Sequence, residues 1–360
     1  MSELYIGVMS GTSLDGIDIT LCDISSTNCI LKASKEYPFD KTLKKEILHL
    51  INSKTLLRQI GILNAKLGDM FAKYILKFLK DFDLDADNIV AIGLHGQTLW
   101  HEPDSELPFS MQLGCPNIVC ARTNIKVITD FRNMDMANGG QGAPFAPAFH
   151  QFLFGKKDKK TAVLNIGGMA NITLLGKNLK GWDVGPGNVL MDLWIHRCKK
   201  LPFDKKGKFA NSGKIIQELL ELMLNDNYFY KEGPKSTGRE KFNKKYISSV
   251  LSNFKNKKDR DIQRTFLELT AKTIARDVKN NKIKELILCG GGSKNTTLVK
   301  RIKKLTKVDV SVSDEHGVSS DFMESMAFAW FAYKRVHNEA VDIKSVTGAS
   351  KNSILGAIYG

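Results

Sequence analysis

Two similar patterns, each an apolar run, a glycine-containing loop and a second apolar run, constrain the fold of this chain more than any other feature. They read "ELYIGVMSGTSLDGIDITLCDI" from residue 3 and "TAVLNIGGMANITLLG" from residue 161. Short apolar runs bounded by glycine and small polar residues are typical of buried strands joined as a hairpin. A third strand is expected after each hairpin, in "CILKASKEYPF" and in "LKGWDVGPGN". We therefore expect two halves of similar pattern with little residue identity between them.

Strand and helix patterns alternate through the rest of both halves. In the first half, helical patterns cover 41–52 and 55–80, and "NIVAIGLHGQT" and "NIKVITDF" follow as strands. The second half has helical patterns at about 188–198, 211–225, 240–254 and 262–280, then the strand "IKELILCGGGSKN", a helix at 294–304, the strand "VDVSVSD" and a final helix in "DFMESMAFAWFAYKRV". This order predicts an α/β fold of two duplicated domains, each a mixed β-sheet that starts with antiparallel strands and is flanked by helices. We expect one lobe to comprise 1–130 and about 340–360, and the other 131–340.

Composition limits the class of protein. The 360 residues exceed one ordinary domain, and 53 Lys and Arg against 38 Asp and Glu give a formal charge of +15. The lysines are scattered among acids with few interleaved aromatics, which favours small anionic ligands over nucleic acid. The chain has neither an apolar stretch long enough to span a membrane nor a signal peptide, so we expect a cytoplasmic location. Metal-binding spacing is absent from the cysteines, which we expect to be free thiols: Cys22, Cys29, Cys115, Cys120, Cys198 and Cys289.

Glycine-rich strand tips suit phosphate binding, because backbone N–H groups there can approach an anion closely. A single tip usually serves only to turn the chain, but three tips together indicate a nucleotide. The third, Gly290–Gly292, precedes a helix and could pack against an adenosine. Asp15 or Asp18 could hold Mg²⁺ beside the phosphates of ATP. The predicted nucleotide-binding residues are Gly11, Thr12, Ser13, Leu14, Asp15, Gly16, Ile17, Asp18, Gly167, Gly168, Asn171, Gly290, Gly291 and Gly292.

The usual nucleotide signatures, the P-loop, the Rossmann fingerprint and the protein-kinase set, do not occur in the sequence. The remaining architecture is the actin-like (ribonuclease H-like) one, in which two duplicated domains bind ATP in a cleft. Along essentially the whole chain, the sequence resembles the anhydro-N-acetylmuramic acid kinase family in these segments: "GVMSGTSLDGID", "GLHGQT", "DFRNMDMANGGQGAPFAPAFH", "LNIGGMANIT", "GWDVGPGN", "KSTGREKFN" and "CGGGSKN".

The resemblance implies an activity. Members of that family convert 1,6-anhydro-N-acetylmuramic acid, water and ATP to N-acetylmuramic acid 6-phosphate and ADP during bacterial cell-wall recycling. It also implies a homodimer, although no segment of the sequence independently indicates an interface. Two alternatives stay open: another actin-like kinase that acts on a simple sugar or a carboxylate, and a regulatory module in which ATP opens and closes a cleft without chemistry.

Two acids are the catalytic candidates. Asp183 in "GWDVGPGN" matches the position of the family's catalytic aspartate, and a carboxylate there could act as the base for water. Its alternative role is to cap a turn. Glu324 in "DFMESMAF" resembles a second acid that the family places near the sugar. The alternative is a capping box, because Asp321 and Glu324 have the spacing of that motif before an apolar helix.

The predicted substrate contacts lie at strand ends and in one loop. Arg132 suits the lactyl carboxylate by bidentate geometry, but a salt bridge to Asp130 or Asp135 is an equal alternative. Ser236 or Thr237 could cap a helix, and Arg239 could contact an anion. Asn171 and Asn188 could position phosphate or Mg²⁺. The full set of predicted substrate residues is His95, Gln97, Thr98, Arg132 and Asn188.

Overall fold

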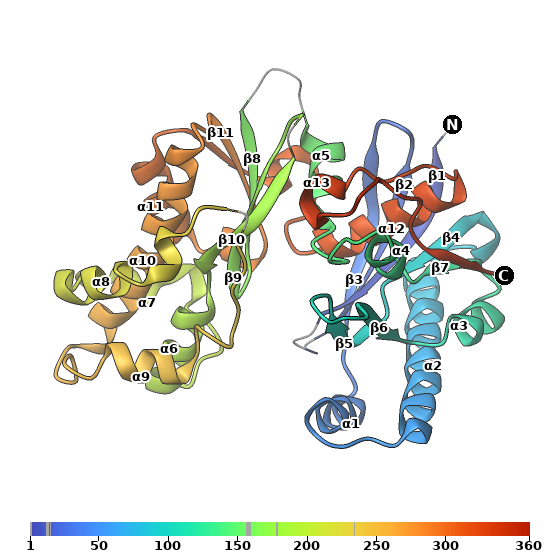
Figure 1. Ribbon diagram of the computed structural model, residues 1–360, viewed down its shortest axis with the longest axis horizontal. Coiled ribbons are helices and arrows are strands. Elements are labelled where there is room, and N and C mark those ends of the chain that lie inside the picture. Colours follow the sequence, from blue (N-terminus) through green and yellow to red (C-terminus); the bar gives the residue numbers. More distant parts are fainter. Residues whose placement is uncertain (1, 12–13, 15, 156–159, 178, 234) are drawn as a thin grey trace. The chain divides into compact units, whose positions relative to one another are not determined.

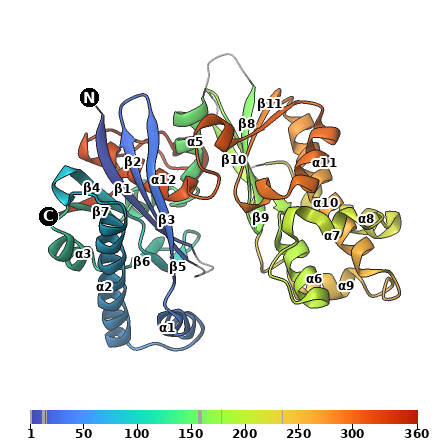
Figure 2. The same cartoon turned by 180° about the vertical axis from the view of Figure 1, so that it is seen from behind.

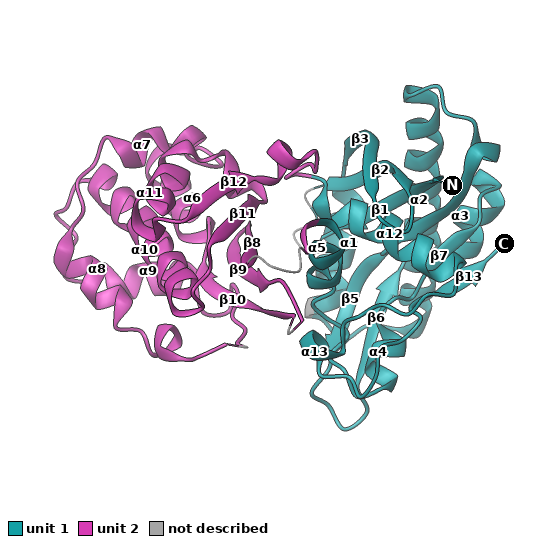
Figure 3. Cartoon of the chain, turned by 90° about the horizontal axis from the view of Figure 1, so that it is seen from above, with its two compact units in different colours: residues 1–153, 322–360 teal, residues 154–321 magenta. Residues whose placement is uncertain are grey.

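The computed structural model describes residues 2–11, 14, 16–155, 160–177, 179–233 and 235–360 (Figure 1). The chain divides into two compact units, shown in different colours in Figure 3. Unit 1 comprises residues 1–153 and 322–360, and unit 2 comprises residues 154–321. Each unit has its own sheet and its own apolar core.

Unit 1 contains, among the described residues, a six-stranded sheet in the order β13-β7-β4-β1-β2-β3. The first three strands pair antiparallel, β1, β4 and β7 pair parallel, and β13 pairs antiparallel with β7. The antiparallel ribbon β5–β6 follows β4. The strands of unit 1 are β1 (Glu3–Ser10), β2 (Gly16–Ile24), β3 (Cys29–Pro38), β4 (Ile89–Leu94), β5 (Gln97–Glu102), β6 (Phe109–Leu113), β7 (Val127–Thr129) and β13 (Ala357–Tyr359).

Helices cover both faces of this sheet (Figures 1 and 2). The alternation of side chains along β1 shows which helix packs on which face. Ile6 and Val8 belong to the core that includes the apolar face of α2 (Leu57–Asp81). On the opposite face, the Tyr5 ring lies 5.7 Å from the Tyr333 ring of α12 (Met323–Val336). The other helices of this part are α1 (Lys41–Asn52), α3 (Pro116–Thr123), α4 (Asn133–Ala137), α5 (Ala146–Phe154), α13 (Lys344–Thr347) and the 3-10 turn Ala86–Asn88.

Unit 2 repeats the same sheet topology with the order β10-β9-β8-β11-β12. Strands β8, β9 and β10 pair antiparallel, whereas β8, β11 and β12 pair parallel. The strands are β8 (Thr161–Ile166), β9 (Met169–Leu174), β10 (Lys180–Pro186), β11 (Glu285–Cys289) and β12 (Asp309–Val312). The match between β1–β4 plus β7 and these five strands confirms the prediction of two duplicated mixed sheets flanked by helices.

The core of unit 2 forms where Leu164 and Ile166 of β8 meet Phe266 and Leu269 of α10 (Asp259–Asn280). The remaining helices are α6 (Val189–Lys199), α7 (Lys208–Asn211), α8 (Gln217–Leu224), α9 (Lys244–Val250) and α11 (Thr296–Thr306). Short 3-10 turns cover Lys205–Gly207, Asn227–Tyr230, Gly291–Lys294 and Ser313–His316.

The unit boundaries differ from the predicted ones. Residues 131–153 and 322–339 belong to unit 1 rather than to the second lobe. The reason is tertiary packing: Phe131 contacts Phe328 and Phe331 of α12, and α12 in turn packs on the first sheet. Such contacts between distant segments leave no local signal in the sequence.

Two compositional expectations can be compared with the structure. All six cysteines are free, and Cys22, Cys29 and Cys289 are buried. None of the described helices combines the length and the apolar character needed to cross a bilayer.

Gly7 tests the packing of α12 on the sheet. A Cβ at Gly7 would collide with the backbone of α12 at Ser325 and Ala329, so Gly7→Ala should destabilise the protein by about 1–3 kcal/mol. Gly61→Ala is the matched control, because nothing lies within 4 Å of a Cβ there and alanine favours the α2 helix by up to about 1 kcal/mol. Urea unfolding followed by circular dichroism measures both. An unchanged midpoint for Gly7→Ala would contradict this packing.

Candidate functional site

Three glycine-containing segments meet at the carboxyl end of β8 in unit 2. Cys289, the last residue of β11, pairs with Asn165 of β8, so the glycine run that follows β11 lies beside the end of β8. A Cβ at Gly290 or Gly292 would lie 3.0 Å or 2.9 Å from the Ile166 carbonyl oxygen. Gly290 also has φ of +75°, a conformation that favours glycine. These glycines therefore permit a backbone approach that side chains would prevent.

The glycine tip between β8 and β9 is joined to the start of α6. The N–H groups of Asn188 and Gly187 donate to the carbonyl oxygens of Gly167 (2.8 Å) and Gly168 (2.9 Å). Asn188 Nδ2 donates to the Ile166 carbonyl oxygen at 3.2 Å. The predicted nucleotide residues Gly167, Gly168, Gly290 and Gly292 thus lie together with Asn188 in one small region of unit 2, whereas Gly291 is exposed.

Asp183 lies in a row of polar residues across the three antiparallel strands of unit 2. In the strand register, Asn165 is opposite Asn171, and Asn171 is opposite Asp183. Directly paired residues project from the same face of a sheet. The neighbours of Asp183, Trp182 and Val184, belong to the core on the other face. The row is half-buried and begins at the carboxyl end of β8, next to the glycine segments.

The Asp183 carboxylate is held by the loop that follows the 3-10 turn at Asn227–Tyr230. Its Oδ2 accepts from the Thr237 N–H at 3.0 Å and from the Ser236 hydroxyl at 3.2 Å. The Tyr228 hydroxyl donates to the Asp183 carbonyl oxygen at 2.6 Å. Burial raises the pKa of Asp183, while the bonds from Thr237 and Ser236 partly oppose that rise. Asp183 is therefore an oriented carboxylate of raised pKa. Because its Oδ2 also accepts hydrogen bonds from the 236–237 loop, the alternative that Asp183 caps a turn describes part of its role.

One expectation for this loop is wrong. Neither Ser236 nor Thr237 caps a helix, because α9 starts later, at Lys244, and the side chain of Asn243 accepts from the N–H groups of Lys245 and Tyr246. Asparagine is as good an N-cap as serine, and no feature of the sequence decided between them.

Asp192 is a candidate acidic residue of the unit 2 site that the sequence analysis missed. It lies in the first turn of α6, where burial raises its pKa to about 7 and the charge of Arg239 opposes that rise. Arg239 also approaches the glycine tip, since a Cβ at Gly168 would lie 3.8 Å from its Nη2. The spacing of Asp192 one helical turn after Asn188 is the signal that could have identified it.

A second polar cluster lies in unit 1, at the carboxyl ends of the parallel strands β1 and β4. The Ser10 hydroxyl at the end of β1 donates to Gln97 Oε1 at 2.7 Å. His95 follows β4, and its backbone N–H donates to the Val8 carbonyl oxygen at 3.1 Å. Arg132 Nη2 lies 2.9 Å from His95 Nε2, and Nη1 donates to the Gly142 carbonyl oxygen at 2.8 Å.

The predicted residues His95, Gln97 and Arg132 are therefore brought to one strand edge, together with Ser10, which the sequence analysis did not select. Thr98 is part of the adjacent ribbon, where its hydroxyl accepts from Gln112 Nε2 at 3.3 Å. Ligands of α/β sheets commonly bind at the carboxyl ends of parallel strands.

Burial controls the charges in this cluster. Desolvation, and to a lesser extent the Arg132 charge, lower the pKa of His95 to about 3. Because a guanidinium only donates, His95 Nε2 must accept, so the ring is neutral with its proton on Nδ1. Desolvation also lowers the pKa of Arg132 to about 10. Arg132 is thus a half-buried, oriented cation beside a neutral imidazole.

The predicted salt bridge from Arg132 to Asp130 or Asp135 is wrong. Asp135 Oδ2 accepts from the Gly142 N–H at 2.8 Å and Oδ1 accepts from the Thr347 hydroxyl at 2.8 Å, while Asp130 accepts from Asn133 at 2.7 Å. Asp135 therefore holds the 139–142 loop, whose Gly142 carbonyl in turn orients Arg132. The 139–142 loop thus supports Arg132.

The capping-box alternative for Glu324 is also wrong. The N-cap of α12 is Phe322, which provides no side-chain hydrogen bond, and Asp321 forms an ion pair with Lys294 instead. The Glu324 side chain is exposed to solvent in part. Desolvation by the surrounding protein raises its pKa, and the charge of Arg132 partly opposes that rise. This electrostatic coupling places Glu324 near the unit 1 cluster, as an acid without a capping role.

The first glycine loop is only partly within the described residues, and Thr12, Ser13 and Asp15 lie outside them. Leu14 has φ of +54°, and its N–H donates to the Gly11 carbonyl oxygen at 3.1 Å. The side chains of Leu14 and Ile17 are buried in the core, so only their backbone could contact a ligand. Gly16 and Asp18 lie in β2, where Asp18 pairs with Met9.

Metal binding by this loop stays a prediction. No group of three or more His, Cys, Asp or Glu that could hold a metal ion occurs among the residues that the structure describes. Mg²⁺ at a nucleotide needs only one or two protein carboxylates, since phosphates and water complete its shell.

The family model and the relatives that match this chain carry the same name. The model of the family described as anhydro-N-acetylmuramic acid kinase matches residues 3–360. Proteins named anhydro-N-acetylmuramic acid kinase are similar to the chain: that of Sulfurovum sp. (strain NBC37-1) is 53% identical over 359 residues, 99% of both chains. That of Sulfurimonas denitrificans is 53% identical over 367 residues, 100% of both, and that of Vibrio vulnificus (strain YJ016) is 44% identical over 364 residues, 99% of this chain and 98% of the relative.

Two solved structures are similar to the chain at low sequence identity. The activator of the 2-hydroxyisocaproyl-CoA dehydratase from Clostridium difficile has a TM-score of 0.47 at 12% identity, over 94% of this chain and 96% of its own. A ROK family glucokinase from Streptomyces griseus has a TM-score of 0.41 at 13% identity, over 92% of this chain and 99% of its own.

The charge state of His95 gives a direct test of the unit 1 cluster. Because burial and Arg132 both disfavour the imidazolium, we expect the His95 ring to stay neutral until the pH falls to about 3. Nuclear magnetic resonance of histidine-labelled protein, with His95→Gln to assign the resonance, measures this titration. A His95 resonance that titrates near the ordinary value of about 6.5 would show that the cluster is open to water.

Proposed function

Because the chain belongs to the anhydro-N-acetylmuramic acid kinase family, we propose that it transfers the γ-phosphate of ATP to 1,6-anhydro-N-acetylmuramic acid and opens its anhydro ring with water. The products are N-acetylmuramic acid 6-phosphate and ADP. The observation that carries this conclusion is the family match over residues 3–360, together with relatives of that name at 53% identity over the whole chain. The enzyme is thus a phosphotransferase of peptidoglycan sugar metabolism.

The reaction joins two bond changes at one oxygen. In the substrate, a single oxygen links C1 to C6. Water attacks C1 while the C1–O6 bond breaks, and O6 attacks the γ-phosphorus of ATP while the bond to the leaving ADP breaks. The water proton passes to a base, which we assign to Asp183. A base of raised pKa removes a proton from water more readily than an ordinary aspartate, because its conjugate acid is weaker.

The surroundings of Asp183 support this assignment. Two donors hold one carboxylate oxygen, Oδ2, at 3.0 Å and 3.2 Å, which fixes the orientation of the group. Asn171, directly across the strand pair, lies on the same face and could bind a hydroxyl or a phosphate oxygen. A fixed base in a half-buried setting is what general base catalysis requires.

The unit 1 cluster supports recognition of an acidic sugar. Arg132 is fixed by Gly142 and by neutral His95, so its charge is not neutralised by a carboxylate within the cluster. We assign it to the lactyl carboxylate of the substrate. Glu324, whose pKa is raised by desolvation and lowered by the Arg132 charge, is assigned to a sugar hydroxyl or to water.

We assign a nucleotide to the glycine segments of unit 2, because Gly290 and Gly292 pack where a Cβ would collide with β8 and Gly291 between them is exposed. When bound, Mg²⁺ neutralises the phosphate charge that develops during transfer. We assign phosphate contacts to the first and second glycine tips and Mg²⁺ to Asp15 or Asp18. By resemblance to the family, we also propose a cytoplasmic homodimer.

A coupled assay for ADP tests the substrate. We expect turnover with 1,6-anhydro-N-acetylmuramic acid and none with a plain hexose, because only the former carries a strained bridge and a lactyl carboxylate. Turnover with the hexose alone would instead support a simple sugar kinase. ATP binding without turnover on any sugar or carboxylate would support a regulatory module.

Asp183→Asn tests the base. The amide keeps an acceptor for Thr237 but cannot take a proton, so turnover should fall at least about 100-fold. Binding of a non-hydrolysable ATP analogue should stay within about twofold, since Asp183 is not among the assigned phosphate contacts. Asp309→Asn, an exposed aspartate on β12 of the same sheet, is the control and should leave turnover unchanged. Normal turnover of Asp183→Asn would remove this residue from the mechanism.

A further inference from the structure

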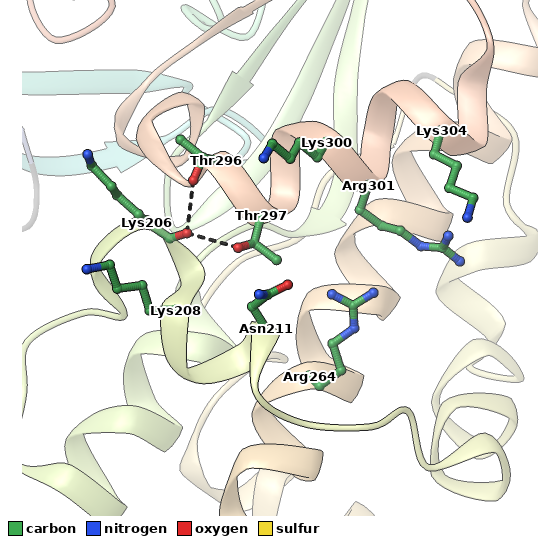
Figure 4. Close-up of a pocket in the computed structure, with 9 residues that line it drawn as sticks. All are labelled: Lys206, Lys208, Asn211, Arg264, Thr296, Thr297, Lys300, Arg301 and Lys304. Carbon is green, nitrogen blue, oxygen red and sulfur yellow. Dashed lines mark hydrogen bonds between the residues drawn. The ribbon is translucent and has the colours of Figure 1, made fainter.

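A basic pocket lies in unit 2, between α7, α10 and α11 (Figure 4). It encloses about 410 Å³, within the range of small-molecule sites. None of the residues assigned above to sugar, phosphate or Mg²⁺ lines it. Its lining residues are Lys206, Lys208, Asn211, Arg264, Thr296, Thr297, Lys300, Arg301 and Lys304.

One wall of the pocket is built by hydrogen bonds. The hydroxyls of Thr296 and Thr297 both donate to the Lys206 carbonyl oxygen, at 3.2 Å and 3.0 Å (Figure 4). The Asp204 carboxylate accepts from the N–H groups of Phe209 and Ala210, at 3.0 Å and 2.9 Å. The segment from residue 204 to 211 is therefore fixed against the start of α11, so this wall of the pocket is held in place by the fold.

Two arginines are oriented by one buried acid. Arg301 forms a bidentate pair with Glu268, at 2.7 Å and 2.5 Å, and Arg264 lies 3.6 Å from the same carboxylate. The Glu268 side chain is fully buried. One negative charge thus fixes two guanidinium groups, and about one positive charge remains unbalanced.

Four lysines add to that excess. Lys206, Lys208, Lys300 and Lys304 are exposed, and none of them forms an ion pair with any residue that the structure describes. Six cations against one acid leave a net charge of about +5 around one cavity. Like charges held this close repel, and a bound polyanion would relieve that repulsion.

The charge and volume point to a ligand with several phosphate groups. A single orthophosphate carries at most about two negative charges near neutral pH, which would leave most of the excess unbalanced. A chain of three phosphates carries more charge, which would balance more of this excess. We infer that this pocket binds a polyphosphate chain, either free or as part of a nucleotide, at a site separate from the kinase reaction.

Equilibrium titration with inorganic tripolyphosphate tests the inference. Lys300→Glu reverses a charge at the pocket, and we expect it to weaken tripolyphosphate binding at least about tenfold. Lys303→Glu is the matched control, because Lys303 is exposed on the same helix but does not line the pocket, and it should change binding by no more than about twofold. Orthophosphate at equal ionic strength should bind at least about tenfold more weakly than tripolyphosphate.

The kinase assay separates this pocket from the nucleotide site of the reaction. Lys300→Glu should leave the KM for ATP and the kcat within about twofold of the unaltered enzyme. An equal loss of tripolyphosphate binding in both variants would show only diffuse attraction by a basic surface and would overturn the inference. An increase in the KM for ATP that matches the loss of tripolyphosphate binding would overturn it as well, by making the pocket part of the reaction site.

A second titration identifies the source of the phosphate chain. Guanosine triphosphate that binds more tightly than tripolyphosphate, with the same sensitivity to Lys300→Glu, assigns the pocket to nucleotides. Equal or weaker binding with that sensitivity assigns it to free polyphosphate. Binding of either probe that is insensitive to Lys300→Glu contradicts the inference.

Discussion

Close backbone packing at the carboxyl end of β8 is the constraint on which the unit 2 site depends. Gly187, Gly290 and Gly292 each occupy a place where a Cβ would collide with the tip of β8. Three segments that are far apart in the sequence can therefore meet within a few ångströms. The polar row that runs from Asn165 to Asp183 starts at the same point, so the proposed base and the glycine segments are positioned by one packing arrangement.

The duplicated topology divides the chemistry between two kinds of groups. In unit 1, the carboxyl ends of β1 and β4 carry side chains, with Ser10, Gln97, His95 and Arg132 linked by hydrogen bonds. In unit 2, the corresponding ends of β8 and β11 are followed by glycines that pack closely together, and Gly291 among them is exposed. Side chains that recognise a carboxylate suit the sugar, and backbone donors suit phosphate. In the proposed function, the same sheet topology thus serves two binding tasks through different residues at one edge.

Local patterns predicted the fold well, and distant contacts account for what was missed. Each hairpin was visible because its strands and its glycine tip are adjacent in the sequence. The position of α12 could not be predicted from the local pattern, because it depends on contacts between distant residues such as Tyr5 and Tyr333. The capping box at Asp321 and the Arg132 salt bridge failed for the same reason: Lys294 and Gly142 compete for those groups from other parts of the chain. Asp183 was found only through family resemblance, since its loop contacts are also nonlocal.

The most direct test of the account follows the bridging oxygen of the substrate. Anhydro sugar labelled with ¹⁸O at the C1–O–C6 bridge is converted with ATP, and ³¹P resonance locates the label in the product. If water attacks C1 while O6 attacks phosphorus, all of the label lies in the C6–O–P linkage, and no unphosphorylated N-acetylmuramic acid is released during turnover. Label at the C1 hydroxyl, or release of the free sugar before phosphorylation, would contradict a single coupled reaction.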